Sequence, residues 1–175
     1  MTAEAIIRPA TAADLPGIQR IYAHHVATGL ASFEEVPPDL AEMTRRFTAL
    51  IEAGFPYLAA EAEGRVVGYA YCGPYRPRPA YRYSVENSVY LAPEAARRGI
   101  GRRLLGALIE QATALGKRQM VAVIGDSANR ASIGLHQALG FREVGTIEGA
   151  GFKHGRWVDS VLMQRALGPG ISTLP

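Results

Sequence analysis

A cluster of glycines and arginines at residues 97–102 is the segment of this sequence best suited to bind a charged ligand. It reads Arg97-Arg98-Gly99-Ile100-Gly101-Arg102, between a predicted strand and a long amphipathic helix. The first-turn N–H groups of a helix, its dipole and nearby arginines attract phosphate, and glycines let an anion approach closely. The pattern indicates a phosphate site, although an ordinary helix start with a solvated basic face would have the same spacing.

Alternating and helical hydrophobic patterns predict the elements that must position this loop. A stiff, irregular, basic and aromatic loop is expected over residues 73–82, where three prolines lie among arginines and tyrosines. Strands are predicted at 6–8, 57–62, 66–71, 83–91, 120–124, 141–147 and 157–164, and helices at 15–26, 40–51, 99–115 and 129–139. The order β-α-α-β-β-β-α-β-α-β-β describes one mixed α/β sheet domain (α+β by some schemes), over residues 1–167, with a tail at 168–175 that we expect to be frayed.

Composition limits the function classes. The chain has 175 residues, 48% hydrophobic and 20% charged, which suits one globular domain and excludes disorder and a fibrous fold. A net charge of +3 is too small to argue for a nucleic-acid partner. No signal peptide or membrane-spanning run is visible, and the single cysteine, Cys72, cannot form an intrachain disulfide. We therefore expect a cytoplasmic protein with no membrane partner.

Two motifs in order resemble a known superfamily. The Arg-Arg-x-Gly-x-Gly run resembles the acetyl-CoA pyrophosphate loop of the GNAT acetyltransferases, and Asn129-Arg130-Ala131-Ser132, then His136, then Leu139-Gly140-Phe141 resembles their second signature. Finer matches are similar to the phosphinothricin and methionine sulfoximine N-acetyltransferases. They are Ser32-Phe33-Glu34, residues 70–75, residues 85–91, residues 121–125 and residues 153–159. The resemblance covers about residues 6–164.

The resemblance implies a GNAT fold, a central mixed and mostly antiparallel sheet flanked by helices. It also implies direct transfer of acetyl from acetyl-CoA to the α-amino group of a small amino-acid analogue such as phosphinothricin, methionine sulfoximine or methionine sulfone, with no covalent acyl-enzyme. The residues it assigns to the acetyl-CoA site are Val89, Tyr90, Leu91, Arg97, Arg98, Gly99, Ile100, Gly101, Arg102, Asn129, Ser132 and His136. Asn129 would serve equally as a helix N-cap.

The implied reaction needs a base, because an amine is mostly protonated at neutral pH, and a carboxylate of raised pKa is suitable. Glu86 is the candidate, since a charge in an otherwise uncharged strand is costly unless it is used or paired. A salt bridge to an arginine of the 73–82 loop is the alternative explanation. A backbone N–H within residues 89–91 would stabilise the oxyanion, as in the superfamily. His136 and Tyr90 are candidate acids for the leaving thiolate, although packing roles explain both equally well or better.

We expect arginine side chains to bind the acceptor, because a guanidinium can donate two hydrogen bonds to a carboxylate or to a polar tetrahedral group. The residues that the resemblance assigns to acceptor binding are Phe33, Tyr75, Arg76, Pro77, Arg78, Glu86, Asn87 and Ser88. A solvated basic loop is the alternative explanation for Arg76 and Arg78. We expect no metal ion, since no ligand spacing is visible. The resemblance further implies a homodimer, with residues 153–159 supporting a pocket wall or a dimer contact. Two other functions stay open: acetylation of another amine, such as a peptide N-terminus or a polyamine, and non-catalytic binding of acyl-CoA.

Overall fold

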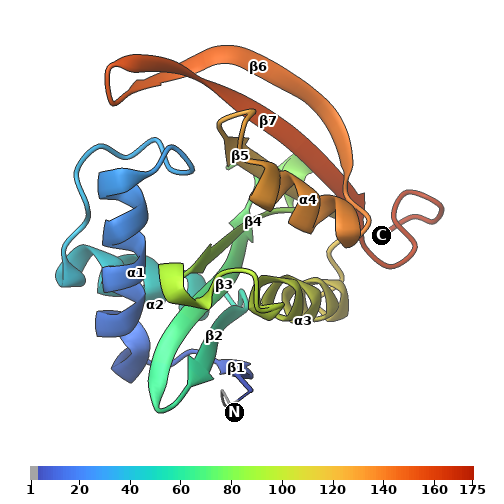
Figure 1. Cartoon of the computed structure of the whole chain (residues 1–175). Helices are drawn as coiled ribbons and strands as arrows, with labels where there is room; N and C mark the ends of the chain where they lie inside the picture. Colours follow the sequence, from blue (N-terminus) through green and yellow to red (C-terminus); the bar gives the residue numbers. More distant parts are fainter. Residues whose placement is uncertain (1–3) are drawn as a thin grey trace.

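The computed structural model describes residues 4–175, which form one seven-stranded sheet with helices on both faces (Figure 1). The strands run in the spatial order β1-β2-β3-β4-β5-β7-β6. Their bounds are β1 Ile6–Pro9, β2 Tyr57–Ala62, β3 Arg65–Pro74, β4 Ser84–Leu91, β5 Gln119–Gly125, β6 Arg142–Lys153 and β7 Arg156–Ala166. The helices are α1 Leu15–Thr28, α2 Leu40–Glu52, α3 Ile100–Ala114 and α4 Arg130–Ala138, with short 3₁₀ turns at Ala12–Asp14, Pro79–Tyr81 and Pro93–Ala95.

Each face of the sheet has its own packing partners. Helices α1 and α2 cover one face, against a row of stacked tyrosine rings from β2, β3 and β4, namely Tyr57, Tyr69, Tyr71 and Tyr90. Helix α3 packs on the opposite face of β1 to β4, and α4 packs on β5. Leu104, Leu105 and Leu108 of α3 are fully buried there, and burying such side chains is worth about 1.5–3 kcal/mol each. The core therefore lies on both sides of the first four strands.

The predicted order of elements is confirmed, and so is the mixed, mostly antiparallel sheet. Two helices begin at the capping residues that the sequence predicts. The Asp39 side chain accepts a hydrogen bond from Glu42 N–H at 2.8 Å and caps α2, and the Asn129 side chain accepts one from Ser132 N–H at 3.2 Å and caps α4. Leu115, predicted on the buried face of α3, is 49% exposed because the helix ends one residue earlier.

The last two strands are longer than predicted. We expected strands at 141–147 and 157–164, but β6 and β7 form a hairpin that continues to a two-residue turn at His154 and Gly155. Both turn residues have positive φ (50° and 75°), which matches the twist of such a hairpin. Two register shifts in β6, after Glu143 and after Ile147, absorb extra residues. In Figure 1 this hairpin arches over the rest of the sheet, with its turn end toward the loop that follows α1.

The 73–82 loop contains more regular structure than predicted. Gly73 and Pro74 complete β3, paired with Glu86 and Val85, and Pro79–Tyr81 forms a 3₁₀ turn. Proline tolerates both positions, because it suits strand ends and the first turn of a helix. The expected frayed tail is exposed at Ile171 and Leu174, but the Arg118 guanidinium donates hydrogen bonds to the Gly170 and Leu174 carbonyl oxygens.

Strands β4 and β5 separate almost as soon as they meet. They form the one parallel pair among the described residues, and the pairing covers only Ser84 to Glu86 opposite Gln119 to Val121. Beyond Glu86, β4 continues for five residues without a partner on that side. Backbone N–H and C=O groups left open in this way must bond to something else, so the gap between the two strands is a binding position built into the sheet.

Candidate functional site

Two cavities meet where β4 and β5 separate. The larger is a groove of about 780 Å³ between the end of α1, the start of α3 and α4, and the smaller is a cavity of about 260 Å³ beside Glu86. Their shared wall consists of Ala31, Val89, Tyr90, Gly125, Asn129 and Ser132. An elongated ligand in the groove can therefore present one end to a small molecule in the cavity, which we call the acceptor cavity.

The first turn of α3 forms one side of the groove. Arg97, Gly99, Gly101 and Arg102 line it, whereas Ile100 is 3% exposed and packs in the core. Gly99 has φ of 75° and precedes the helix, so its Cβ-free backbone permits the left-handed turn that aims the first N–H groups outward. Arg98 is exposed beside the groove but is not among its lining residues. The geometry and charge fit a diphosphate.

Sequence reasoning missed the α1 side of the groove. The His25 ring lies 2.8 Å from the Leu91 carbonyl oxygen through Nε2, and 5.3 Å from the Tyr90 ring. Burial lowers the pKa of His25, so the neutral ring donates its Nε2–H to that carbonyl and fixes the end of β4. The helical spacing of α1 predicted a buried face, but only the fold shows that this face meets β4.

Glu86 lies in the acceptor cavity, half-buried, with Tyr71, Ser88 and Tyr90 on the same wall. Burial raises the pKa of Glu86 above its ordinary value, and the positive charge of Arg76 opposes that shift. Within residues 4–175, no ion pair includes Glu86, so the alternative explanation of a salt bridge to Arg76, Arg78 or Arg82 does not describe the structure. Its carboxylate is free to accept a proton.

His136 is buried under the same cavity and both of its ring nitrogens have partners. Nδ1 lies 2.8 Å from the Ser132 carbonyl oxygen and Nε2 lies 3.0 Å from Asn87 Oδ1. The Asn87 amide donates to the Val121 carbonyl oxygen at 3.2 Å, which links β4 to β5 at the point where they separate. Burial lowers the pKa of His136, and the hydrogen bond to Ser132 opposes this. Both partners are hydrogen-bond acceptors, so the neutral ring donates to one of them at a time, and Asn87 lies in the cavity wall between the ring and β5.

Tyr90 lies on the wall between the two cavities. Its ring contacts Tyr22 edge-on at 5.1 Å between centroids and stacks on Tyr69 at 5.5 Å. Burial raises the pKa of Tyr90 well above its ordinary value, so the phenol carries its proton at neutral pH. A protonated hydroxyl at this wall can donate a proton or a hydrogen bond to either cavity.

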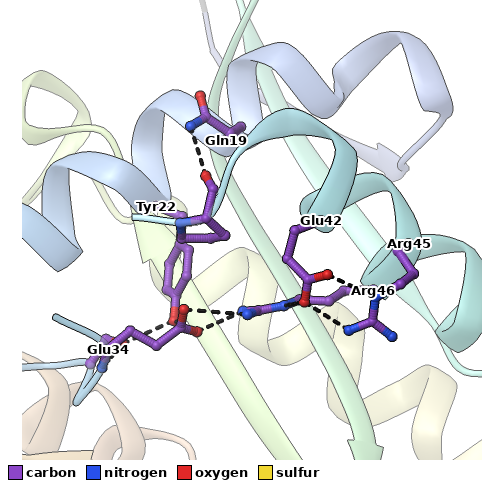
Figure 2. A network of polar contacts seen from close by, with 8 residues as sticks. Gln19, Tyr22, Glu34, Glu42, Arg45 and Arg46 are labelled. Carbon is purple, nitrogen blue, oxygen red and sulfur yellow. Dashed lines mark hydrogen bonds and ion pairs between the residues drawn. The ribbon is translucent and has the colours of Figure 1, made fainter. Parts of the chain in front are cut away.

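The loop after α1 forms the outer wall of the acceptor cavity, and a polar network fixes it. Figure 2 shows Tyr22, Glu34 and Arg46 pointing toward one another from α1, this loop and α2. Tyr22 donates to Glu34 Oε1 at 2.8 Å and lies 2.9 Å from Ser32 Oγ, and Arg46 pairs with Glu34 at 2.6 Å. Arg46 also pairs with Glu42 at 2.7 Å within α2. Ser32, Phe33 and Glu34 belong to a motif visible in the sequence, whereas the contacts of Tyr22 and Arg46 with Glu34 were not predicted.

The predicted acceptor residues divide into two groups. Phe33, Glu86, Asn87 and Ser88 line the acceptor cavity. The segment Tyr75 to Arg78 does not line it: it is mostly exposed, the Arg76 guanidinium stacks on the Tyr75 ring at 4.8 Å, and Tyr75 lines a separate surface hollow with Tyr81 and Val144. Arg76 is linked to the cavity electrostatically, because its positive charge lowers the pKa of Glu86.

Across residues 4–175, no three His, Cys, Asp or Glu side chains are grouped so as to hold a metal ion. No helix in the same range has the length and apolar character needed to cross a membrane.

Comparisons with known proteins agree with this geometry. Residues 7–162 match the family model for the acetyltransferase (GNAT) domain. The chain is 56% identical over 162 residues to phosphinothricin N-acetyltransferase of Alcaligenes faecalis, covering 93% of this chain and 82% of that one. It is 46% identical over 166 residues to the L-methionine sulfoximine/L-methionine sulfone acetyltransferase of Pseudomonas paraeruginosa, covering 94% and 96%.

A solved structure is similar over the whole fold. The GNAT superfamily phosphinothricin acetyltransferase from Sinorhizobium meliloti, in complex with AcCoA, superposes with a TM-score of 0.95 at 50% identity. The match covers 99% of this chain and 94% of that one.

The first prediction concerns Gly99. A valine there must adopt φ near 75°, which β-branched residues resist, so the turn before α3 should shift and the affinity for acetyl-CoA should fall about tenfold or more in calorimetry. Gly116→Val is the matched control, because Gly116 has φ of 73° at the other end of α3 and is not among the groove's lining residues. Wild-type affinity in Gly99→Val, or equal losses in both variants, would contradict the assignment of the phosphate loop.

Proposed function

The chain belongs to the GNAT acetyltransferase family and is an acetyl-CoA-dependent N-acetyltransferase, and we propose that its acceptor is the α-amino group of a small amino-acid analogue. Phosphinothricin, methionine sulfoximine and methionine sulfone are the proposed acceptors, because two similar enzymes are named for such compounds. The observation that carries the proposal is the meeting of the long groove with a cavity of about 260 Å³ that contains an unpaired carboxylate.

The groove fits acetyl-CoA in both of its parts. The first turn of α3 with Arg97 and Arg102 would hold the diphosphate, and the unpaired edge of β4 would bond to the amide-bearing arm. Asn129 and Ser132 lie on the shared wall, where the arm must pass to reach the acceptor cavity. In this arrangement the acetyl group enters the cavity close to Glu86, because the thioester forms the end of that arm.

Glu86 acts as the general base in our proposal. Its desolvated carboxylate has a raised pKa, so it takes a proton from the acceptor ammonium, directly or through one water, more readily than an exposed glutamate would. The neutral amine then attacks the thioester carbonyl, the C–N bond forms, and the C–S bond breaks. No acyl-enzyme is needed, since both substrates meet in one space.

Two further groups complete the proposed reaction. A backbone N–H of Val89, Tyr90 or Leu91, on the unpaired edge of β4, would stabilise the oxyanion. Tyr90 and His136 are the candidate proton donors to the leaving thiolate. Tyr90 is the better placed of the two, because it lines both cavities and keeps its proton, whereas both nitrogens of His136 are already engaged.

The arginines of the 73–82 loop would bind the acceptor carboxylate from the rim of the cavity. Support for Arg76 is its electrostatic effect on Glu86, which requires proximity. Arg78 is exposed and has no ion-pair partner among the described residues, so its guanidinium is available. Phe33, Asn87 and Ser88 would contact the rest of the acceptor from the cavity wall.

We also propose a homodimer formed through the β6–β7 hairpin. Four of its large apolar side chains are more than half exposed, namely Val144, Ile147, Phe152 and Trp157. Phe152 and Trp157 are cross-strand partners with ring centroids 5.2 Å apart, and these two rings form an apolar patch on one face of the hairpin. A second copy of the same hairpin is the proposed cover, because a self-complementary patch suits two-fold pairing.

The proposed acceptor class is tested by a panel of amines with purified protein and acetyl-CoA. Release of free thiol should be fast with methionine sulfoximine, methionine sulfone or phosphinothricin, slower with ordinary amino acids, and slowest with a short peptide or a polyamine. Faster turnover of the peptide or the polyamine would replace the proposed acceptor, and thiol release with none of the amines would overturn the proposed function.

The role of Glu86 is tested by Glu86→Gln, which keeps the shape and removes the base. The rate of transfer should fall about a hundredfold or more near neutral pH, while the affinity for acetyl-CoA stays unchanged. The wild-type rate should decline as the pH falls through the raised pKa of Glu86, because protonation removes the base, and the variant should lack that decline. Glu110→Gln, at an exposed position on α3, is the control. An unchanged rate and pH profile would exclude Glu86 as the base.

The dimer is tested by Trp157→Glu, which places a charge in the apolar patch. Light scattering after size exclusion should show a dimer for the wild type and a monomer for the variant, because a buried unpaired carboxylate is strongly unfavourable at an interface. Ile171→Glu, at an equally apolar exposed residue in the tail, should stay dimeric. A monomeric wild type would refute this assembly.

A further inference from the structure

Lys153, near the end of β6, is a buried cation held by a single backbone carbonyl. Lys153 is only 2% exposed, and its Nζ donates a hydrogen bond to the Ser32 carbonyl oxygen at 2.7 Å. Within the part of the chain that the structure describes, it forms no ion pair with a carboxylate. Burial lowers the pKa of Lys153, and the negative charges of Glu35 and Glu34 oppose that shift without a direct contact. The direct contact of the buried ammonium is thus the one with the Ser32 carbonyl oxygen, and it is the feature to explain.

Gly151 contacts the same loop from the same face of β6. Because side chains alternate along a strand, residues 151 and 153 share a face, and Phe152 lies on the other with Trp157. A Cβ at position 151 would lie 2.7 Å from Cε2 and 2.8 Å from Cδ2 of the Phe33 ring. The ring thus rests directly on the backbone of β6, at a distance that only glycine allows.

Two further sets of contacts hold the loop segment 29–34 in place. At its start, a Cβ on Gly125 at the end of β5 would collide with the Leu30 carbonyl oxygen, so Leu30 and Ala31 lie directly on that strand. At its end, Tyr22 and Arg46 hold Ser32 and Glu34 through the network of Figure 2. The hairpin adds two contacts at Phe33 itself and beside it: Gly151 lies against the Phe33 ring, and Lys153 donates to the Ser32 carbonyl oxygen.

We propose that Lys153 and Gly151 are positioning residues for the acceptor: they fix Phe33 as a wall of the acceptor cavity and thereby determine which amines bind. The proposal rests on the proposed function, since it concerns the same cavity. Phe33 lines the acceptor cavity but not the groove, Ala31 lines both, and Gly29 and Leu30, at the other end of the segment, line only the groove. Loss of the hairpin contacts should therefore weaken acceptor binding and leave acetyl-CoA binding unchanged.

Gly151→Ala is the sharper test. The added methyl group displaces the Phe33 ring without removing any hydrogen bond, and the glycine has no positive φ, so alanine fits the strand. The KM for the best amine of the panel should rise about tenfold, with kcat and the KM for acetyl-CoA nearly unchanged, because small misplacements of a positioning element have large effects. Gly145→Ala is the matched control: it lies on the same strand, and a Cβ there meets nothing within 4 Å.

Lys153→Met tests the hydrogen bond itself. Methionine keeps the length and apolar stem of lysine but leaves the Ser32 carbonyl oxygen without its donor. The same rise in amine KM is expected, together with weaker discrimination between methionine sulfone and a smaller amino acid. Arg142→Met, which removes an exposed cation from β6, should match the wild type. If Lys153→Met does not fold, Gly151→Ala decides the question alone.

The outcomes separate this inference from the proposed function. Size exclusion should show the same oligomeric state for every variant, since Gly151 and Lys153 lie on the face of β6 opposite Phe152. Wild-type turnover together with a wild-type amine KM in Gly151→Ala would overturn the inference and leave the proposed function standing. Equal increases in the KM for the amine and for acetyl-CoA would also overturn it, because the loop would then act on both sites. Failure of the wild type to turn over any amine would instead overturn the proposed function.

Discussion

The separation of β4 from β5 after three residue pairs is the constraint on which the rest of the structure depends. A parallel pair that continued to Leu91 would satisfy its own backbone and leave no edge for a ligand. Because the pairing stops at Glu86 and Val121, the open edge of β4 runs from Glu86 toward the loop that precedes α3. The Asn87 side chain donates to the Val121 carbonyl oxygen where the strands separate, and the buried His136 ring lies against Asn87. The polar groups buried under the cavity thus stabilise the gap itself.

The same separation sets the electrostatics of the site. Glu86 is the last paired residue, so its carboxylate leaves the sheet at the base of a narrow cavity, where burial raises its pKa. The arginine-rich loop at residues 97–102 lies at the far end of β4, where the arginines and the first turn of α3 face solvent. One strand therefore has a desolvated carboxylate at one end and a solvated basic loop at the other, and an elongated ligand in the groove can reach from the loop to the acceptor cavity.

Much of this arrangement could be predicted from the sequence, because local signals carry it. The glycines before α3, the caps Asp39 and Asn129, and the isolated charge of Glu86 each have a short-range physical meaning. The missed features are all long-range. Tyr22 and Arg46 belong to ordinary helix faces until the fold brings Glu34 between them. The Lys153 segment was expected at a pocket wall or a dimer contact, but its partner, a carbonyl 121 residues away, was not predicted. No periodicity reveals such pairs.

The length of the hairpin could not be predicted locally either, because the glycines at 149 and 151 weaken the strand pattern after the predicted end at residue 147. The structure shows the reason for one of them: Gly151 leaves room for the Phe33 ring, so the residue that weakens the strand is the one that lets the cavity wall form. Alternation then has a consequence for the whole molecule. Since residues 151 and 153 face the loop segment 29–34, Phe152 must face away with Trp157, and the two exposed rings lie on the opposite side of β6 from the cavity wall. One strand therefore carries two faces with different tasks: one supports the Phe33 ring, and the other presents the two rings that the proposed partner would cover.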